Sequence, residues 1–369
     1  MESLLLAFLF VLPLNVVVQA YGSSIIGERL ERRGEPLLVA PVSRTDIVAG
    51  KTLPYVAASL LAVSAIAAVI GGGPLAVAAV TPIVLLFLAA TFVGAMFARS
   101  FKELTFVTVT VTVVGTTYVF VPAIFTDVHP IAAISPLSVV VADLAGTGTD
   151  PATVAFATLP MTLVAVVLFA LGAGIYRAED MFTQRAPWAK AYDALAADLT
   201  RRRVAIWGAL SVPFDFIAEL FAIALLFVAP ASLAVPLLLS VVAVVEEIAK
   251  SLFVRAGFAR GRLGGRGLAA AATGALAGLG FAVGEKITLA AQFVGLPDLE
   301  LGQAAFAPAA ADDPLLLAAL FAAPFVLHAG TAAISAVGAA RSRRAYAIGL
   351  AAAVAVHLGY NLAVVSAVA

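Results

Sequence analysis

The sequence predicts an all-α, polytopic integral membrane protein with about ten transmembrane helices, arranged as two halves of five helices each. Three observations lead to this prediction: the composition, the length of the apolar segments and the distribution of the basic residues. Of the 369 residues, 63% are hydrophobic and 12% are charged, and the mean hydropathy is +1.08. Soluble domains carry about 25% charged residues, so most side chains of this chain must face lipid or other helices.

The composition also excludes several kinds of chemistry. The chain contains no cysteine, which rules out disulfides, thiolate metal sites and cysteine nucleophiles. Its 22 basic residues are balanced by 22 acidic residues, so the net charge does not indicate a nucleic-acid partner, and we expect none.

Ten apolar segments are long enough to cross the hydrocarbon core of about 30 Å, which takes about 20 helical residues. The alternating pattern of a membrane barrel is absent, so all spans are expected to be helical. The first twenty residues lack a basic start and a convincing cleavage site, so we interpret them as a span and not as a signal peptide. The expected spans are 3–21, 53–71, 75–98, 104–125, 152–175, 204–228, 232–254, 267–294, 314–339 and 345–368.

The basic residues predict the orientation of these spans. Only Lys250 and Lys286 lie inside expected spans, and the other basic residues all fall in alternate loops. The opposite loops carry acidic residues without basic ones. Because cytoplasmic loops are enriched in Lys and Arg, we expect a multi-pass protein of the cell membrane with both termini outside the cytoplasm. The basic loops are Arg29–Lys51, Arg99–Lys102, Arg177–Arg203, Arg255–Arg266 and Arg341–Arg344.

The longest basic stretch divides the chain into a first domain at residues 1–185, a cytoplasmic connecting segment at 186–203 and a second domain at 204–369. The first domain carries a charged cytoplasmic element from Gly27 to Arg44, continued by Gly50-Lys51, and an external Ile134-Ser-Pro-Leu137 segment. These features resemble the permease subunits of ABC exporters of the sodium and drug-export type, although that family's first span and large external segment are missing. The resemblance implies a separate ATPase as partner, since no GxxxxGK[ST] phosphate loop occurs in this chain. The alternative is a basic loop that anchors the cytoplasmic face.

The second domain differs from the first because its expected spans contain charged and polar residues. A charged side chain at the centre of the bilayer costs about 2.5–3.5 kcal/mol on insertion scales, so such residues indicate function by default. Residues four apart share a helix face, which places Glu246 beside Lys250 and His357 beside Asn361. We therefore expect four helices to bring these groups into one polar cavity. At about 1.5 Å per residue, Glu285 comes out about 27 Å deep and His328 only about 17 Å deep. The alternative is that the Gly/Ala-rich stretch 264–274 protrudes into the cytoplasm, which would bring Glu285 near the other polar residues. The polar residues are Asp215, Glu219, Glu246, Glu247, Lys250, Glu285, Lys286, His328, His357 and Asn361.

Four motifs occur in order on successive spans of this second domain. They are the EExxK pattern of Val244-Val-Glu-Glu-Ile-Ala-Lys250, the FxxxE pattern of Gly280-Phe-Ala-Val-Gly-Glu285, the isolated His328, and the HxxxN pattern of His357-Leu-Gly-Tyr-Asn361. Over residues 204–369 the chain resembles PrsW-type intramembrane proteases, which are related to the CAAX prenyl proteases. The resemblance implies an intramembrane endopeptidase whose substrate is a membrane-anchored protein in the lipid bilayer.

Peptide hydrolysis needs a water activated by a base and donors for the developing oxyanion. We assign Glu246 as the base, with His357 and Asn361 orienting water and donating to the oxyanion. Glu285 and His328 are expected to hold water or a metal, and Lys250 to keep a neighbouring glutamate ionised. Glu247 lies about 100° around the helix from Glu246 and is either a further member of this catalytic set or a structural residue. Asp215, Glu219 and Lys286 have no motif and no assigned role.

Two questions stay open in the sequence. A single zinc ion could be held by Glu285, His328 and His357, because two imidazoles and a carboxylate suffice for catalytic zinc. The charges of Glu246, Glu247 and Glu285 are largely balanced if Lys250 and Lys286 both point inward, which favours a metal-free site. The sequence therefore leaves open whether the site holds a metal. Two other functions compete with proteolysis: a permease subunit that needs a separate ATPase, and a proton- or ion-coupled carrier that uses the same carboxylates.

Overall fold

The computed structural model describes residues 2–31, 33, 36, 41–125, 130–176, 185–226, 231–295 and 314–368. These described residues form helices and no β-strand, which confirms the predicted all-α class. They divide into two compact units, and the chain passes from the first to the second between Ala194 and Leu195, with a second crossing at Ala290 and Ala291.

Eight helices of the described residues are long and apolar enough to cross a membrane. They are Glu2–Leu30, Arg44–Ile70, Pro74–Phe97, Phe101–Ala123, Pro151–Ile175, Leu268–Ala291, Phe321–Ala339 and Arg343–Ser366. The two other expected spans also form helices, α11 (Val204–Leu226) and α12 (Ala231–Ala259). Glu246, Glu247 and Lys250 lie within little more than one turn of α12 and lower its hydropathy. The protein is a polytopic membrane protein, and the number ten stays a prediction.

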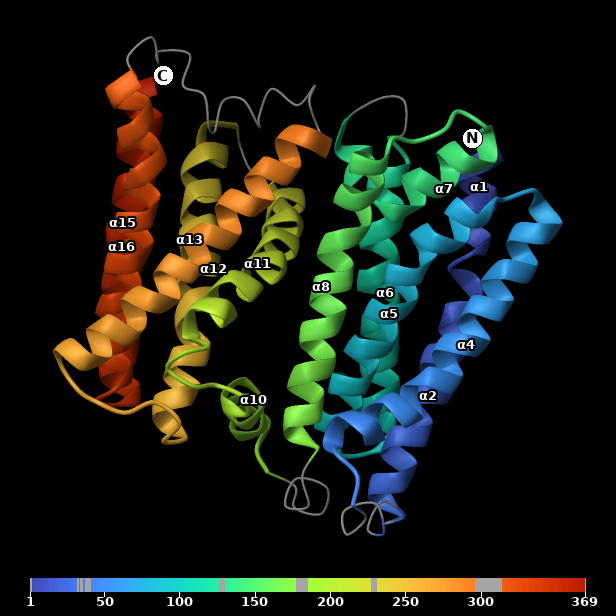
Figure 1. Cartoon of the computed structure of the whole chain (residues 1–369), viewed down its shortest axis with the longest axis horizontal. Helices are drawn as coiled ribbons and strands as arrows, with labels where there is room; N and C mark the ends of the chain where they lie inside the picture. The colour runs from blue at the N-terminus through green and yellow to red at the C-terminus, as the bar shows by residue number, and fades with distance from the viewer. Residues whose placement is uncertain are drawn as a thin grey trace. The chain divides into compact units, whose positions relative to one another are not determined.

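The first unit is built around α5 (Figure 1). This helix packs against α2, α4, α6, α7 and α8, and 61% of its apolar window is buried inside the protein. Its C-terminal carbonyl groups are satisfied by two buried cations. Arg29 donates to the carbonyls of Ala95 and Ala98, and Lys190 Nζ donates to that of Met96 at 3.0 Å. Positive side chains at this end compensate both the orphan carbonyls and the helix dipole.

The elements of this unit begin with the helices α1 (Glu2–Leu9), α2 (Leu12–Leu30), α4 (Arg44–Ile70), α5 (Pro74–Phe97) and α6 (Phe101–Ala123). They continue with the short 3₁₀ helix η1 (Pro130–Ile134) and with α7 (Pro136–Ala145), α8 (Pro151–Ile175) and most of α10 (Pro187–Ala196). The charged element expected between Gly27 and Lys51 lies partly outside the described residues. Within its described part, Lys51 forms an ion pair with Glu28.

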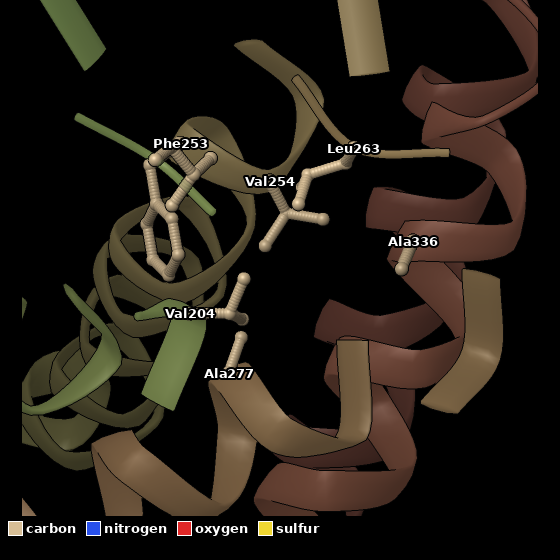
Figure 2. Packing of buried hydrophobic residues seen from close by; sticks show 7 residues of the cluster. Val204, Phe253, Val254, Leu263, Ala277 and Ala336 are labelled. Atoms are coloured by element: carbon tan, nitrogen blue, oxygen red, sulfur yellow. The ribbon is translucent and has the colours of Figure 1, made fainter. Parts of the chain in front are cut away.

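The second unit contains α11, α12, most of α13 (Leu268–Gly295), α15 (Pro314–Ala339) and α16 (Arg343–Val368). Helices α15 and α16 lie side by side (Figure 1), and α12 packs against α11, α15 and α16. Figure 2 shows part of its apolar core, where Val204 at the start of α11 faces Ala277 of α13. Phe253 and Val254 of α12 lie beside this pair, and Ala336 of α15 belongs to the same cluster, which therefore joins four of the helices that carry the polar residues.

Glycines allow the helices of this unit to approach closely. A Cβ added at Gly280 would collide with the carbonyl oxygen of Ala205 in α11, and one added at Gly278 with that of His328 in α15. Small residues at such crossings let two backbones meet without a side chain between them. Gly278 and Gly280 therefore determine how α13 is aligned against α11 and α15.

Candidate active site

Three charged residues of the site come from α12. The side chains of Glu247 and Lys250 are fully buried, and Lys250 Nζ lies 3.0 Å from Glu247 Oε1. Glu246 is more distant, with its Oε2 3.7 Å from the same nitrogen. The sequence left open which glutamate Lys250 holds ionised, and the structure pairs it with Glu247.

His328 of α15 lies between Lys250 and Glu285. Its Nδ1 is 2.6 Å from Lys250 Nζ, and its Nε2 is 2.8 Å from Glu285 Oε2. An ammonium group can only donate hydrogen bonds, so Nδ1 accepts from Lys250 and Nε2–H donates to Glu285. These two contacts orient a neutral imidazole from both sides.

His357 of α16 is oriented by the other buried glutamate. Its Nδ1 lies 2.9 Å from Glu247 Oε1, and because the carboxylate can only accept, Nδ1–H is the donor. This leaves Nε2 of His357 facing Glu246, at 3.7 Å from Oε2. The two imidazole rings lie 5.3 Å apart, edge to face.

Glu246 lies at the centre of this arrangement. Its Oε2 is 3.7 Å from Nδ1 of His328 and 3.7 Å from Nε2 of His357, with 12% of the side chain exposed. The oxygen is buried and has no hydrogen-bond partner among the described residues. A buried carboxylate oxygen is normally bonded, because leaving it unpaired costs free energy. Glu246 Oε2 is therefore a position that a proton, a water or a metal ion would complete.

The structure thus brings together six of the seven predicted catalytic residues: Glu246, Glu247, Lys250, Glu285, His328 and His357. Asn361, the seventh, lies half-buried one turn beyond His357 on α16. No described residue forms a hydrogen bond with its side chain. Glu247 contacts His357 and Lys250 although it lies on a different side of α12 from Glu246. Its spacing of three residues from Lys250 was the indication in the sequence that these two side chains could meet.

The depth mismatch expected for Glu285 does not occur. Gly280 of α13 packs against Ala205, which lies in the first turn of α11. At 1.5 Å per residue, about 18 Å of α13 therefore comes before the level at which α11 begins, and a depth counted from the start of α13 overestimates that of Glu285. Phe281 then contacts the ring of His328 at 5.1 Å. Glu285 follows one turn later on the same face, and helical side chains point toward the N-terminus, so its carboxylate reaches His328.

Two carboxylates without a motif also join the site. Asp215 and Glu219 of α11 each place a carboxylate oxygen within 4.8 Å of the other and of a Glu246 oxygen. The sequence assigned them no role. Their spacing of four residues inside an apolar span was the only indication that they share one face.

The donor atoms also fit a metal ion. One donor atom each from Glu246, His328 and His357 lies within 4.8 Å of the others. Each imidazole is oriented by a carboxylate on its other nitrogen, which is the usual support of metal-binding histidines. The sequence predicted Glu285 as the carboxylate ligand. In the structure Glu285 bonds to His328, and Glu246 takes the central position.

Fold and site together define a polytopic membrane protein with a buried carboxylate and histidine site inside its second unit. Residues 201–369 match the model of the PrsW family intramembrane metalloprotease. The match confirms the predicted resemblance for the C-terminal half, and the protein is a membrane-embedded peptide hydrolase, a protease. The resemblance of the first half to exporter permeases stays a prediction. No curated protein and no solved structure matches the chain.

Proposed function

We propose that the protein is an intramembrane endopeptidase that hydrolyses peptide bonds of membrane-anchored proteins with a water held by Glu246, His328 and His357. The observation that supports this most directly is the buried, unpartnered Oε2 of Glu246, 3.7 Å from a nitrogen of each histidine. A water at this position would donate one proton to Glu246 and the other to Nε2 of His357, and it would be oriented by Nδ1 of His328 once Lys250 releases that nitrogen. General-base activation of water needs this combination.

In the proposed reaction, Glu246 accepts a proton from the water, and the oxygen of that water bonds to the carbonyl carbon of the substrate. The proton then passes to the leaving nitrogen as the C–N bond breaks. Asn361, one turn beyond His357, offers an amide N–H to the developing oxyanion. His357 uses Nδ1–H on Glu247, so its Nε2 is an acceptor while the ring is neutral. This assigns His357 to holding water and leaves oxyanion donation to Asn361.

Three residues act by positioning the others. Glu247 sets the tautomer and direction of His357, while Lys250 and Glu285 do the same for His328 from opposite sides. Imidazoles held in this way do not need to be ordered during the reaction, and such preorganisation lowers the barrier.

The family name implies a metal, and Glu246, His328 and His357 are the residues that would hold it. When bound, it would lower the pKa of a bound water and polarise the carbonyl. Nδ1 of His328 has one lone pair, so binding a metal there requires Lys250 to release that nitrogen. Zinc is the ion we propose, because two imidazoles and one carboxylate are a usual catalytic zinc set.

The test is to replace Glu246 by Gln, which keeps shape and removes the base. We expect cells that express Glu246→Gln to lack membrane-derived peptides found with the wild type, and the purified variant to cleave none of the substrates so identified. Glu31→Gln, at an exposed position of the first unit, is the matched control and should cleave like the wild type. Wild-type turnover by folded Glu246→Gln protein would contradict the proposal.

The basic loops further support a cell-membrane protein with both termini outside the cytoplasm. We infer membrane-anchored proteins as the substrate class, because the site lies among helices that expose many large apolar side chains, such as Val283, Ile287 and Val326.

A further inference from the structure

Asp215 and Glu219 lie on one face of α11, four residues apart, and belong to none of the motifs. Asp215 is 6% exposed, and its Oδ1 is buried without a hydrogen-bond partner in the part of the chain that the structure describes. Oε1 of Glu219 is unpartnered in the same way. Two unpaired carboxylates inside an apolar helix are costly to keep, so something must compensate them.

The oxygens converge on Glu246. One carboxylate oxygen each from Asp215, Glu219 and Glu246 lies within 4.8 Å of the other two. Three atoms so spaced have a common point no more than about 2.8 Å from each, close to the 2.3–2.6 Å of Ca²⁺–oxygen bonds. A small change of side-chain torsion would bring them to bonding distance of a divalent cation.

Lys250 lies closer to two other groups than to this trio. Its Nζ is 3.0 Å from Glu247 and 2.6 Å from His328, against 3.7 Å from Glu246 Oε2. Lys286 lies beside Glu285 at 3.5 Å and over the ring of Phe321 at 5.7 Å. A bound cation would supply the positive charge that three ionised carboxylates at this spacing require.

We propose that Asp215, Glu219 and Glu246 bind a hard divalent cation, of the class of Ca²⁺, Mg²⁺ or Mn²⁺. The donor set is oxygen only, which these ions prefer, whereas imidazole suits zinc. Glu246 belongs to this group and to the histidine group, so the cation would keep Glu246 anionic next to the reacting water. Apart from Glu246, the inference does not depend on the proposed proteolytic mechanism.

Mn²⁺ is the probe, because the free ion is quantified by its electron paramagnetic resonance signal. Full-length protein in detergent is stripped of metal with a chelator and titrated with Mn²⁺ without substrate. The wild type should bind one ion per chain, displaceable by Ca²⁺, and the double variant Asp215→Asn with Glu219→Gln should bind it at least tenfold more weakly. Asp198→Asn, at an exposed position, removes one charge and should bind like the wild type.

His357→Ala separates this site from the histidine group. It should retain Mn²⁺ binding if the ion sits on the oxygens of α11 and α12. Wild-type affinity in the double variant, no uptake by the wild type at millimolar Mn²⁺, or equal loss in His357→Ala would each overturn the proposal. If the double variant elutes as an aggregate, the nearly isosteric Asp215→Asn alone is measured against the same outcomes. Failure here would leave the Glu246→Gln cleavage test unaffected.

Discussion

Glu246 and Glu247 are neighbours in the sequence, yet their contacts predict different effects of a Glu→Gln substitution on the stability of the second unit. Glu247 is fully buried and bonds to Lys250 at 3.0 Å and to His357 at 2.9 Å. Breaking a buried ion pair costs about 3–5 kcal/mol. The amide of Glu247→Gln can still accept both hydrogen bonds, so we expect a loss near the lower end, about 3 kcal/mol. At about 2–4 °C per kcal/mol for a unit of this size, the Tm should fall by roughly 6–12 °C.

Glu246→Gln should leave stability almost unchanged, within about 1 kcal/mol, because Oε2 makes no hydrogen bond that the variant would lose. The chain has two tryptophans, and Trp207 packs against the apolar core of the second unit. A Trp188→Phe background, at an exposed position, therefore makes the remaining fluorescence specific for unfolding of this unit in detergent. An unchanged Tm for Glu247→Gln, or an equal fall for Glu246→Gln, would refute the reasoning.

Three further predictions follow from packing, metal content and orientation. Gly278→Ala should weaken cleavage at least tenfold and lower the Tm, because the added Cβ meets the His328 carbonyl, with overpacking costing about 1–3 kcal/mol. Gly330→Ala, where nothing lies within 4 Å, is the control, and equal behaviour of the two variants would contradict the glycine argument. Chelation should abolish cleavage and zinc should restore it, as followed by metal analysis and a cleavage assay; full activity of metal-free protein would exclude the metal. A cysteine introduced at Asp312 should react with impermeant reagents only from outside the cell, and labelling only from the cytoplasm would reverse the topology.

The all-α membrane class was predictable because hydropathy adds residue by residue along the chain. A helix that meets lipid has to satisfy its own backbone and to be apolar over its length. The same reasoning selected the candidate site residues, since a charge inside an apolar span is conspicuous against its surroundings. Glu246, Glu285 and His357 were all predicted in this way, and their roles stay predictions.

The pairing of these residues was not predictable, because it depends on the alignment of one helix against another. The depth computed from helix ends placed Glu285 about 10 Å away from His328 in depth. Close contacts at Gly278 and Gly280 instead bring Phe281 and Glu285 to His328. Helix ends in the sequence carry no information on this alignment.

The sequence by itself determined the class of protein, the helices and the chemical groups available to the second unit. Only the tertiary structure decided that Glu247 holds His357 and Lys250, that Glu246 lies unpartnered between two histidines, and that Asp215 and Glu219 join it. The physical reason is that spacing along a helix specifies which side chains share a face. Which face meets which neighbour, and at what height, is decided by interhelical packing of small residues.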